Sequence, residues 1–518
     1  MVRIACLFFV AAVVSLSASA AVKMPRIFGD NMVLQQQKPV AVWGTALPNA
    51  SVEVVFGEDS AKTKAGPDGK WKVFLPAQKA SFFPRTLSVS ENGAVGAEFG
   101  NVLVGEVWIT GGQSNMEWYI KNTDAFERAL SDARNYKIRQ FTQVILASDS
   151  VRDDVVDRKA RWIESLDKSN AGKWAAVSYY FAEEIAKAMN VPVGILYTPV
   201  GGASMMPFTP GDVLAESKGY FKKRYEEFLE RSKGDTHEKS VARWRKARAE
   251  FEAKQKADEA AGKKPAVMPH YLRAAPWRGV PFPFYWRSTP TLLYNGSVLP
   301  ILPYSTRGII WYQGCADSSA EAAEVFDDML EKMAGAWRRD SGEADKPFLI
   351  VQLASFSTDH KFAEVREAQF KAANKMKNSG VINIADTGEQ WDIHPRDKDI
   401  VGSRLGKLAL QKVYKKPGVF AQSPEMKTVL FNGPKAEVKF ETFGRGLEAR
   451  GDVRGFEVLA GGKWLPASAK LNGETVVVEN PDGAEIRGVR YLWHSWVRPD
   501  VCLFNKDGLP AFPFLKTK

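Results

Sequence analysis

Hydrophobic and polar residues alternate in short runs between residues 25 and 100. Residues 71–75 read Trp-Lys-Val-Phe-Leu, and comparable runs occupy residues 40–43 and 52–56. Turn-forming residues separate these runs, for example Pro67-Asp68-Gly69. Short strands at this spacing are typical of a β-sandwich. We therefore expect a small sandwich-like domain over residues 22–100.

The pattern changes at residue 101, where mainly apolar runs of strand length begin. These runs lie at residues 102–110, 193–197, 308–312, 348–353 and 381–385. Helical patterns lie between several of them, at residues 174–189, 363–377 and 401–413. Apolar strands that alternate with helices predict a parallel sheet covered on both faces. We expect this α/β domain to span residues 101–424.

Two further segments complete the predicted organisation. Residues 219–264 are rich in Lys, Arg, Glu and Ala, which predicts one or two solvated helices within an insertion at about residues 209–290. The stretch 277–286 that follows is rich in Pro and aromatic residues and is expected, with residues 205–208, to line a groove. Strand signals return at residues 456–459, 475–478 and 489–493, so we expect a second small β region over residues 425–518.

The start of the chain has the pattern of an export signal. Arg3 precedes an apolar run at residues 4–14, which is too short to span a bilayer, and Ala18-Ser19-Ala20 offers small residues for cleavage. The alternative is a buried N-terminal helix. We expect residues 1–20 to be a signal peptide and the mature protein to be periplasmic or secreted, without an integral membrane segment.

Net charge and cysteine count bear on three classes of protein: nucleic-acid-binding proteins, disulfide-rich proteins and zinc proteins. The chain has 518 residues and a formal net charge of +11, with basic residues spread along it. No nucleic-acid-binding motif accompanies this charge. It is expected to form a solvated surface that can also attract acidic substrates. Beyond the predicted signal only Cys315 and Cys502 remain, so the sequence has neither a disulfide framework nor zinc-ligand spacing.

The sharpest local motif is Gly111-Gly112-Gln113-Ser114-Asn115-Met116, directly after the apolar run 102–110. Ligands of parallel sheets bind beyond the carboxyl ends of the strands, and a helix starting there would direct its N–H groups to the same place. Ser114 is therefore a candidate nucleophile. The other interpretation, a helix-capping serine in a glycine-rich turn, is equally consistent with the local sequence.

A nucleophilic serine needs a base, and the chain has five histidines. His394 follows the predicted strand 381–385 and precedes the predicted helix 401–413, which places it in another strand-end loop. His360 is a reserve candidate in a polar loop, and His494 lies among aromatic residues where a structural role is more probable. Position therefore favours His394.

Several motifs together resemble the sialate O-acetylesterase family of SGNH-type hydrolases. The motifs near the site are residues 112–116, Trp311-Tyr312-Gln313-Gly314 and Asp392-Ile393-His394-Pro395-Arg396-Asp397-Lys398. Residues 28–35 and 39–44 resemble the family's opening, and residues 508–514 resemble its ending. The resemblance implies an SGNH-like catalytic domain and hydrolysis of O-acetyl groups on sialic acids, without a metal or other cofactor.

The same resemblance implies roles for individual residues. Ser114 corresponds to the nucleophile, His394 to the general base and Asp392 to the acidic residue that orients it. Because Asp392 lies only two positions before His394, Asp386 and a simple Ser–His dyad stay open as alternatives.

The implied oxyanion hole consists of the Ser114 N–H and an N–H of Gly201 or Gly202. Many relatives carry an asparagine where this chain has Asp317, and an ionised carboxylate would repel a developing oxyanion. Either Asp317 turns away or is protonated, or another amide, plausibly that of Gln313, donates the hydrogen bond. Cys315 beside it is a minor alternative nucleophile.

Two other functions compete with the leading one. A related esterase acting on acetylated xylan, pectin or another glycan would use the same residues. A glycan-binding protein without catalysis would exploit the abundant aromatic residues, and the aspartate at position 317 is its one supporting feature.

Overall fold

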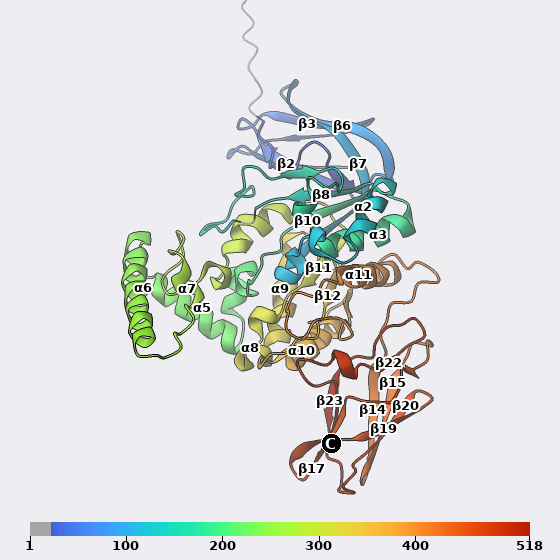
Figure 1. Ribbon diagram of the computed structural model, residues 1–518. Coiled ribbons are helices and arrows are strands. Elements are labelled where there is room, and N and C mark those ends of the chain that lie inside the picture. The colour runs from blue at the N-terminus through green and yellow to red at the C-terminus, as the bar shows by residue number, and fades with distance from the viewer. Residues whose placement is uncertain (1–21, 145) are drawn as a thin grey trace, which may run out of the picture.

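The computed structural model describes residues 22–144 and 146–518. The predicted signal peptide, residues 1–20, lies outside this described part. In Figure 1 the N-terminal β region lies at the top, the central sheet with its helices in the middle, and the C-terminal β region at the bottom. The expected α/β class, with accessory β structure at both ends of the chain, is confirmed.

The central sheet is parallel except for one edge strand, because β9 runs antiparallel to β8. Its strands, in spatial order, are β13 (Ser379–Ile382), β12 (Phe348–Val351), β11 (Gly308–Tyr312), β7 (Ala94–Gly112), β10 (Val193–Tyr197), β8 (Ile138–Thr142) and β9 (Arg161–Ile163). The apolar runs predicted as strands form β7, β10, β11, β12 and β13. β13 ends at Ile382, earlier than predicted, and the next side chain, Asn383, donates to the backbone oxygens of Pro510 and Ala511.

Alternate residues of the strands enter two different cores. In β7, Trp108 packs into the core that also holds α3 (Ala176–Met189) and α11 (Lys398–Lys412). Its neighbours Val107 and Ile109 pack into the core that holds α9 (Phe326–Asp340) and α10 (Phe362–Lys375). The period of two thus buries both faces of the sheet, as the apolar runs predicted.

One long strand belongs to both the sandwich and the central sheet. The first part of β7 pairs with β6, while its last residues pair with β10 and β11. The expected boundary between residues 100 and 101 therefore falls inside a continuous strand. The other strands of the N-terminal region are β1 (Val33–Gln35), β2 (Val40–Thr45), β3 (Ser51–Phe56), β4 (Asp59–Lys64), β5 (Lys70–Leu75) and β6 (Ser81–Glu91).

The C-terminal region has two four-stranded antiparallel sheets around a core of its own. The first contains β14 (Glu425–Asn432), β15 (Lys435–Glu441), β20 (Thr475–Glu479) and β19 (Ser468–Asn472). The second contains β18 (Lys463–Pro466), β17 (Phe456–Ala460), β21 (Gly488–Tyr491) and β23 (Phe514–Thr517). A short pair, β16 (Glu448–Ala449) with β22 (Leu503–Phe504), completes it.

The charged segment forms helices that project to the left of the sheet in Figure 1. These helices are α5 (Gly219–Ser232), α6 (His237–Ala260) and the short α7 (His270–Arg273). Ser240 is the one buried residue of α6, so this helix is solvated almost all round. The remaining helices are α1 (Ser114–Glu117), α2 (Phe126–Asp132), α4 (Gly211–Ala215) and α8 (Ala320–Glu324). In the described part of the chain, no helix has the length and apolarity that a bilayer span requires.

Candidate active site

Ser114 lies at the carboxyl end of β7, the strand flanked by β10 and β11. Gly112 ends the strand with φ +136°, and a Cβ there would lie 2.2 Å from the Tyr312 oxygen, so only glycine fits this close approach. The chain then turns into α1, which spans four residues. Because α1 is a single turn, its dipole is small, and individual N–H groups determine what this turn can bind.

His394 meets Ser114 although the two residues are 280 positions apart. Its Nε2 lies 2.8 Å from the Ser114 Oγ, which is hydrogen-bond distance. The loop that carries His394 connects β13 with α11, as the sequence predicted. The Trp118 ring stacks on the imidazole, with centroids 4.9 Å apart and planes inclined by 15°. This stacking holds the imidazole in the plane that points Nε2 at the serine.

The environment of His394 keeps its imidazole neutral. Burial lowers the pKa of His394 below 6.5, and the positive charge of Lys398 lowers it further. The negative charge of Asp392 opposes both effects. At neutral pH the imidazole can therefore accept a proton from the serine hydroxyl.

The two candidate acidic residues have different surroundings. Asp392 Oδ1 accepts the backbone N–H of His394 at 2.9 Å, but it lies 3.6 Å from Nδ1, too far for a good hydrogen bond. The Asp392 side chain is also 52% exposed. Asp386 instead binds both guanidinium nitrogens of Arg404, at 2.6 and 2.7 Å. The geometry is therefore closest to a Ser–His dyad with a nearby carboxylate.

The loop after β10 supplies N–H groups beside Ser114. A Cβ on Gly201 would lie 3.6 Å from the Ser114 Cβ, which shows how near the glycine backbone comes. The Gly201 N–H, however, already donates to Glu117 Oε2. Burial raises the pKa of Glu117, and the Gly201 N–H opposes that rise. Across residues 22–144 and 146–518, the N–H groups of Ser114 and Gly202 have no acceptor, so these two are free to bind an oxyanion.

Asp317 turns away from this position, and Gln313 is not free to replace it. The buried Asp317 carboxylate accepts hydrogen bonds from Ser204 Oγ, the Met205 N–H and Gln313 Nε2, at 2.7, 2.8 and 2.7 Å. Gln313 Nε2 also donates to the Ala203 oxygen at 3.3 Å, which occupies both of its hydrogens. Of the alternatives that the sequence left open, this arrangement matches the one in which Asp317 turns away. Burial raises the pKa of Asp317, against the effect of its three donors.

The other candidates from the sequence are not arranged for catalysis. Burial raises the pKa of Cys315 to about 12, so its thiol stays protonated, and Cys315 and Cys502 are both free thiols. His494 pairs with Glu457 at 2.8 Å.

Two residues that the sequence analysis gave no role do reach the site. They are Asn115 and Lys398, which both lie within the motifs quoted there. Among the described residues, no cluster of His, Cys, Asp and Glu is arranged to hold a metal ion.

A cavity of about 700 Å³ is lined by Glu117, the last residue of α1, and not by Ser114 or His394 themselves. Glu117, Val200 and Arg287 line it, and so do Trp277 and Trp286, whose rings stack 4.5 Å apart. The aromatic stretch 277–286 thus contributes to this cavity as expected. Residues 205–208 do not, because they are buried in the core.

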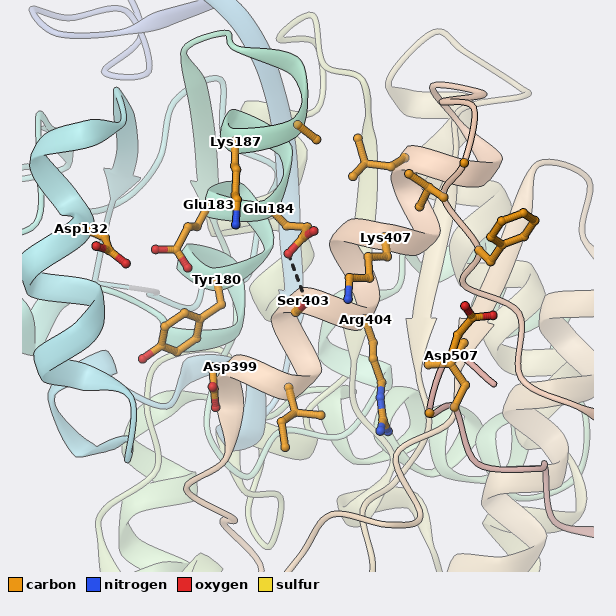
Figure 2. A pocket seen from close by; sticks show the side chains of 18 of the residues that line it. Asp132, Tyr180, Glu183, Glu184, Lys187, Asp399, Ser403, Arg404, Lys407 and Asp507 are labelled. Carbon is orange, nitrogen blue, oxygen red and sulfur yellow. Dashed lines mark hydrogen bonds between the residues drawn. The ribbon is translucent and has the colours of Figure 1, made fainter. Parts of the chain in front are cut away.

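Figure 2 shows a second cavity of about 700 Å³, bordered by α3 and α11. Its walls carry charges of both signs, among them Lys187, Lys407 and Asp399. Ser403 donates to Glu184 there. Neither Ser114 nor His394 lines this cavity.

Comparisons with known proteins agree with this geometry. A family model described as "carbohydrate esterase, sialic acid-specific acetylesterase" matches residues 293–411, which include His394. Sialate O-acetylesterase of Mus musculus is 24% identical over 97% of this chain and 95% of its own length. The human sialate O-acetylesterase is 22% identical over 96% of this chain and 93% of its own length.

A solved structure has the same fold over almost the whole chain. The carbohydrate acetylesterase from Xanthomonas citri superposes with a TM-score of 0.78 at 29% identity, covering 96% of this chain and 100% of that one. Together with the family model and the curated relatives, this agreement shows that the chain is a carboxylic ester hydrolase that is similar to sialate O-acetylesterases over nearly its whole length.

Proposed function

We propose that this enzyme removes O-acetyl groups from a carbohydrate through an acetyl-serine intermediate, with Ser114 as nucleophile and His394 as general base. The observation that carries the proposal is the 2.8 Å contact between Ser114 Oγ and His394 Nε2. A serine hydroxyl is a weak nucleophile until an adjacent base accepts its proton. The neutral imidazole held by Trp118 is suited to that task.

In the first half of the reaction, Oγ attacks the acetyl carbonyl carbon while its proton passes to Nε2. The negative charge on the carbonyl oxygen is then stabilised by the N–H groups of Ser114 and Gly202, which are free in the resting structure. When the tetrahedral intermediate collapses, the sugar oxygen leaves and takes the proton from Nε2. Water repeats the sequence on the acetyl-serine, which releases acetate and restores the hydroxyl.

We further propose O-acetylated sialic acids as the substrate class. The support comes from two sources: the curated relatives are sialate O-acetylesterases, and the cavity that Glu117 of α1 lines is cationic. Its basic side chains are Lys159, Arg161, Lys173 and Arg287, against the acidic Glu117 and Asp157. Such a field attracts the carboxylate of a sialic acid more strongly than a neutral xylan chain.

The mechanism is tested with p-nitrophenyl acetate. We expect Ser114→Ala to abolish turnover and His394→Ala to be comparably damaging, and the double variant to be no worse than either single one, because the two residues act as a unit. His494→Ala is a matched histidine control that should retain activity. Turnover by Ser114→Ala at the wild-type rate would identify a different nucleophile and reject the proposal.

The substrate class is tested by acetate release from a panel of O-acetylated sialic acids, acetylated xylan and acetylated pectin. We expect sialic acids to give the highest kcat/KM, and Arg287→Ala to raise KM for them more than for xylan. A preference for acetylated xylan would assign the enzyme to the related glycan esterases instead. Absence of turnover on every ester, with glycan binding retained, would favour a binding protein.

A further inference from the structure

The first residue of α11, Lys398, carries its amino group into the interior of the protein. Its side chain is fully buried, and burial lowers the pKa of Lys398 to about 7, against the opposing charge of Asp397. Burying an ammonium group is unfavourable unless hydrogen bonds replace its water. An apolar side chain could fill this buried position without the unfavourable free energy of burying an ammonium group. The role of Lys398 therefore lies with the hydrogen-bond partner of its amino group.

That partner is the residue next to the nucleophile. Lys398 Nζ donates to the Asn115 Oδ1 at 2.6 Å, and the Asn115 Nδ2 in turn donates to the backbone oxygen of Ile393 at 2.9 Å. Asn115 directly follows Ser114, and Ile393 directly precedes His394. The side chain of Asn115 thus connects the turn that holds the nucleophile to the loop that holds the base.

The chemistry of the three groups allows only one orientation of the amide. An ammonium group can only donate and a backbone carbonyl can only accept, so the Asn115 oxygen must face Lys398 and its NH₂ must face Ile393. Without the amino group, the Asn115 oxygen would lose its donor, and only the Ile393 oxygen would still favour this orientation. A turned amide would set its oxygen against the Ile393 oxygen and separate the two segments.

We propose that Lys398 is a positioning residue of the esterase reaction: its amino group orients the Asn115 amide, which clamps the His394 loop onto the Ser114 turn. The inference rests on the proposed function, because it concerns the same serine and histidine. Lys398 contacts neither the substrate nor the reacting atoms. It acts through Asn115, and its loss should affect the rate of reaction rather than substrate binding.

Lys398 also has an electrostatic effect that a purely structural lysine would lack. The charged groups that act on His394 are Lys398, which lowers the pKa of the imidazole, and Asp392, which raises it. Burial and Lys398 lower the pKa of His394 from its ordinary value, so Lys398, with its pKa of about 7, still carries its charge at the acidic pH where the imidazole gains a proton. Removing this positive charge should therefore raise the pKa of His394 and move the acidic limb of the pH profile to higher pH.

The test is Lys398→Met, which keeps the length of the side chain and removes the donor. With p-nitrophenyl acetate we expect kcat to fall by about tenfold to a hundredfold, the size of effect that a small misplacement of catalytic groups produces, while KM stays nearly constant. The acidic limb of kcat/KM should shift to higher pH. Lys412→Met, in the last turn of the same helix and also partly buried, is the matched control and should keep the wild-type kcat and pH profile.

A second variant tests the same link from the other side. Asn115→Asp still accepts from Lys398 but has no N–H for Ile393, so it should also lower kcat, and Lys398→Met should add little to its effect. This variant decides the question if Lys398→Met does not fold, as judged by circular dichroism and thermal melting. Wild-type kcat and pH profile in a folded Lys398→Met, or in Asn115→Asp, would overturn the inference. Failure of the wild-type enzyme to turn over any acetyl ester would instead reject the proposed function.

Discussion

At the scale of single residues, the N–H donors that the site can offer to an oxyanion are those that do not already have an acceptor. The Gly201 N–H is held by Glu117, and both hydrogens of the Gln313 amide are held by Asp317 and Ala203. Within the described part of the chain, the N–H groups of Ser114 and Gly202 are left without an acceptor. The sequence could name all of these residues as candidates, but it could not say which donors were already occupied.

The first prediction concerns Asp392, whose carboxylate lies 3.6 Å from the imidazole Nδ1. Because this contact is long and the side chain is half exposed, Asp392→Asn should lower kcat by less than about tenfold, far below the roughly 10⁴-fold loss expected for a buried triad aspartate. Asp392 raises the pKa of His394, so its removal should lower that pKa. The neutral imidazole is the active form, and the acidic limb of kcat/KM should therefore move to lower pH.

This prediction is checked by pH–rate profiles of wild type and Asp392→Asn with p-nitrophenyl acetate. Asp386→Asn, at the carboxylate paired with Arg404, is the companion variant and should leave the position of the acidic limb unchanged. A loss of about 10⁴-fold in Asp392→Asn would show that a full triad forms during the reaction.

At the scale of elements, the site depends on the close packing of α11 against α3. α11 begins at Lys398, four residues after His394, so its position sets that of the catalytic loop. A Cβ on Gly402 would lie 2.4 Å from the Tyr180 Cβ, and a Cβ on Gly406 would lie 2.5 Å from the Glu184 Cβ. Helical periodicity predicted both helices, but it gave no sign of this close contact, because the glycines have no side chain to contribute to the pattern.

We predict that Gly402→Ala lowers the free energy of unfolding by about 1–3 kcal/mol, as overpacking does, and lowers kcat because α11 must move away from α3. Gly335→Ala, within α9, is the matched control, since nothing lies within 4 Å of a Cβ there. That change should stabilise the protein by up to about 1 kcal/mol through helix propensity. Thermal melting and p-nitrophenyl acetate turnover measure both effects, and equal stability of the two variants would contradict the packing argument.

At the scale of the whole molecule, the N-terminal sandwich and the central sheet form one unit. They share β7, and one continuous hydrophobic core includes Val54 of the sandwich as well as Ile309 and Trp337 beside the sheet. The sequence pattern changes at residue 101, but β7 continues through that point. Nothing in the local pattern could show the shared core.

We therefore predict that damage to the sandwich also inactivates the enzyme. Val54→Ala removes buried methyl groups and should cost about 2 kcal/mol, lowering the temperature at which esterase activity is lost. Val95→Ala, at a valine of β7 that is 64% exposed, should leave this temperature unchanged. Calorimetry combined with activity after heating measures the effect. If the sandwich melted while esterase activity was fully retained, the prediction that the sandwich and the central sheet unfold together would be contradicted.

The sequence by itself determined the α/β class, the strand runs and the insertion, because periodicity is a local property of the chain. Its motifs, together with the family resemblance, made Ser114 and His394 the candidate nucleophile and base. Only the tertiary structure decided that Asp386 pairs with Arg404, that Asp317 binds Ser204, Met205 and Gln313, and that Lys398 reaches Asn115. Several of these contacts join residues that are far apart in the chain, such as Lys398 and Asn115. The sequence offers several possible hydrogen-bond partners for each polar side chain near the site. Only the folded structure shows which of them lies close enough to bind.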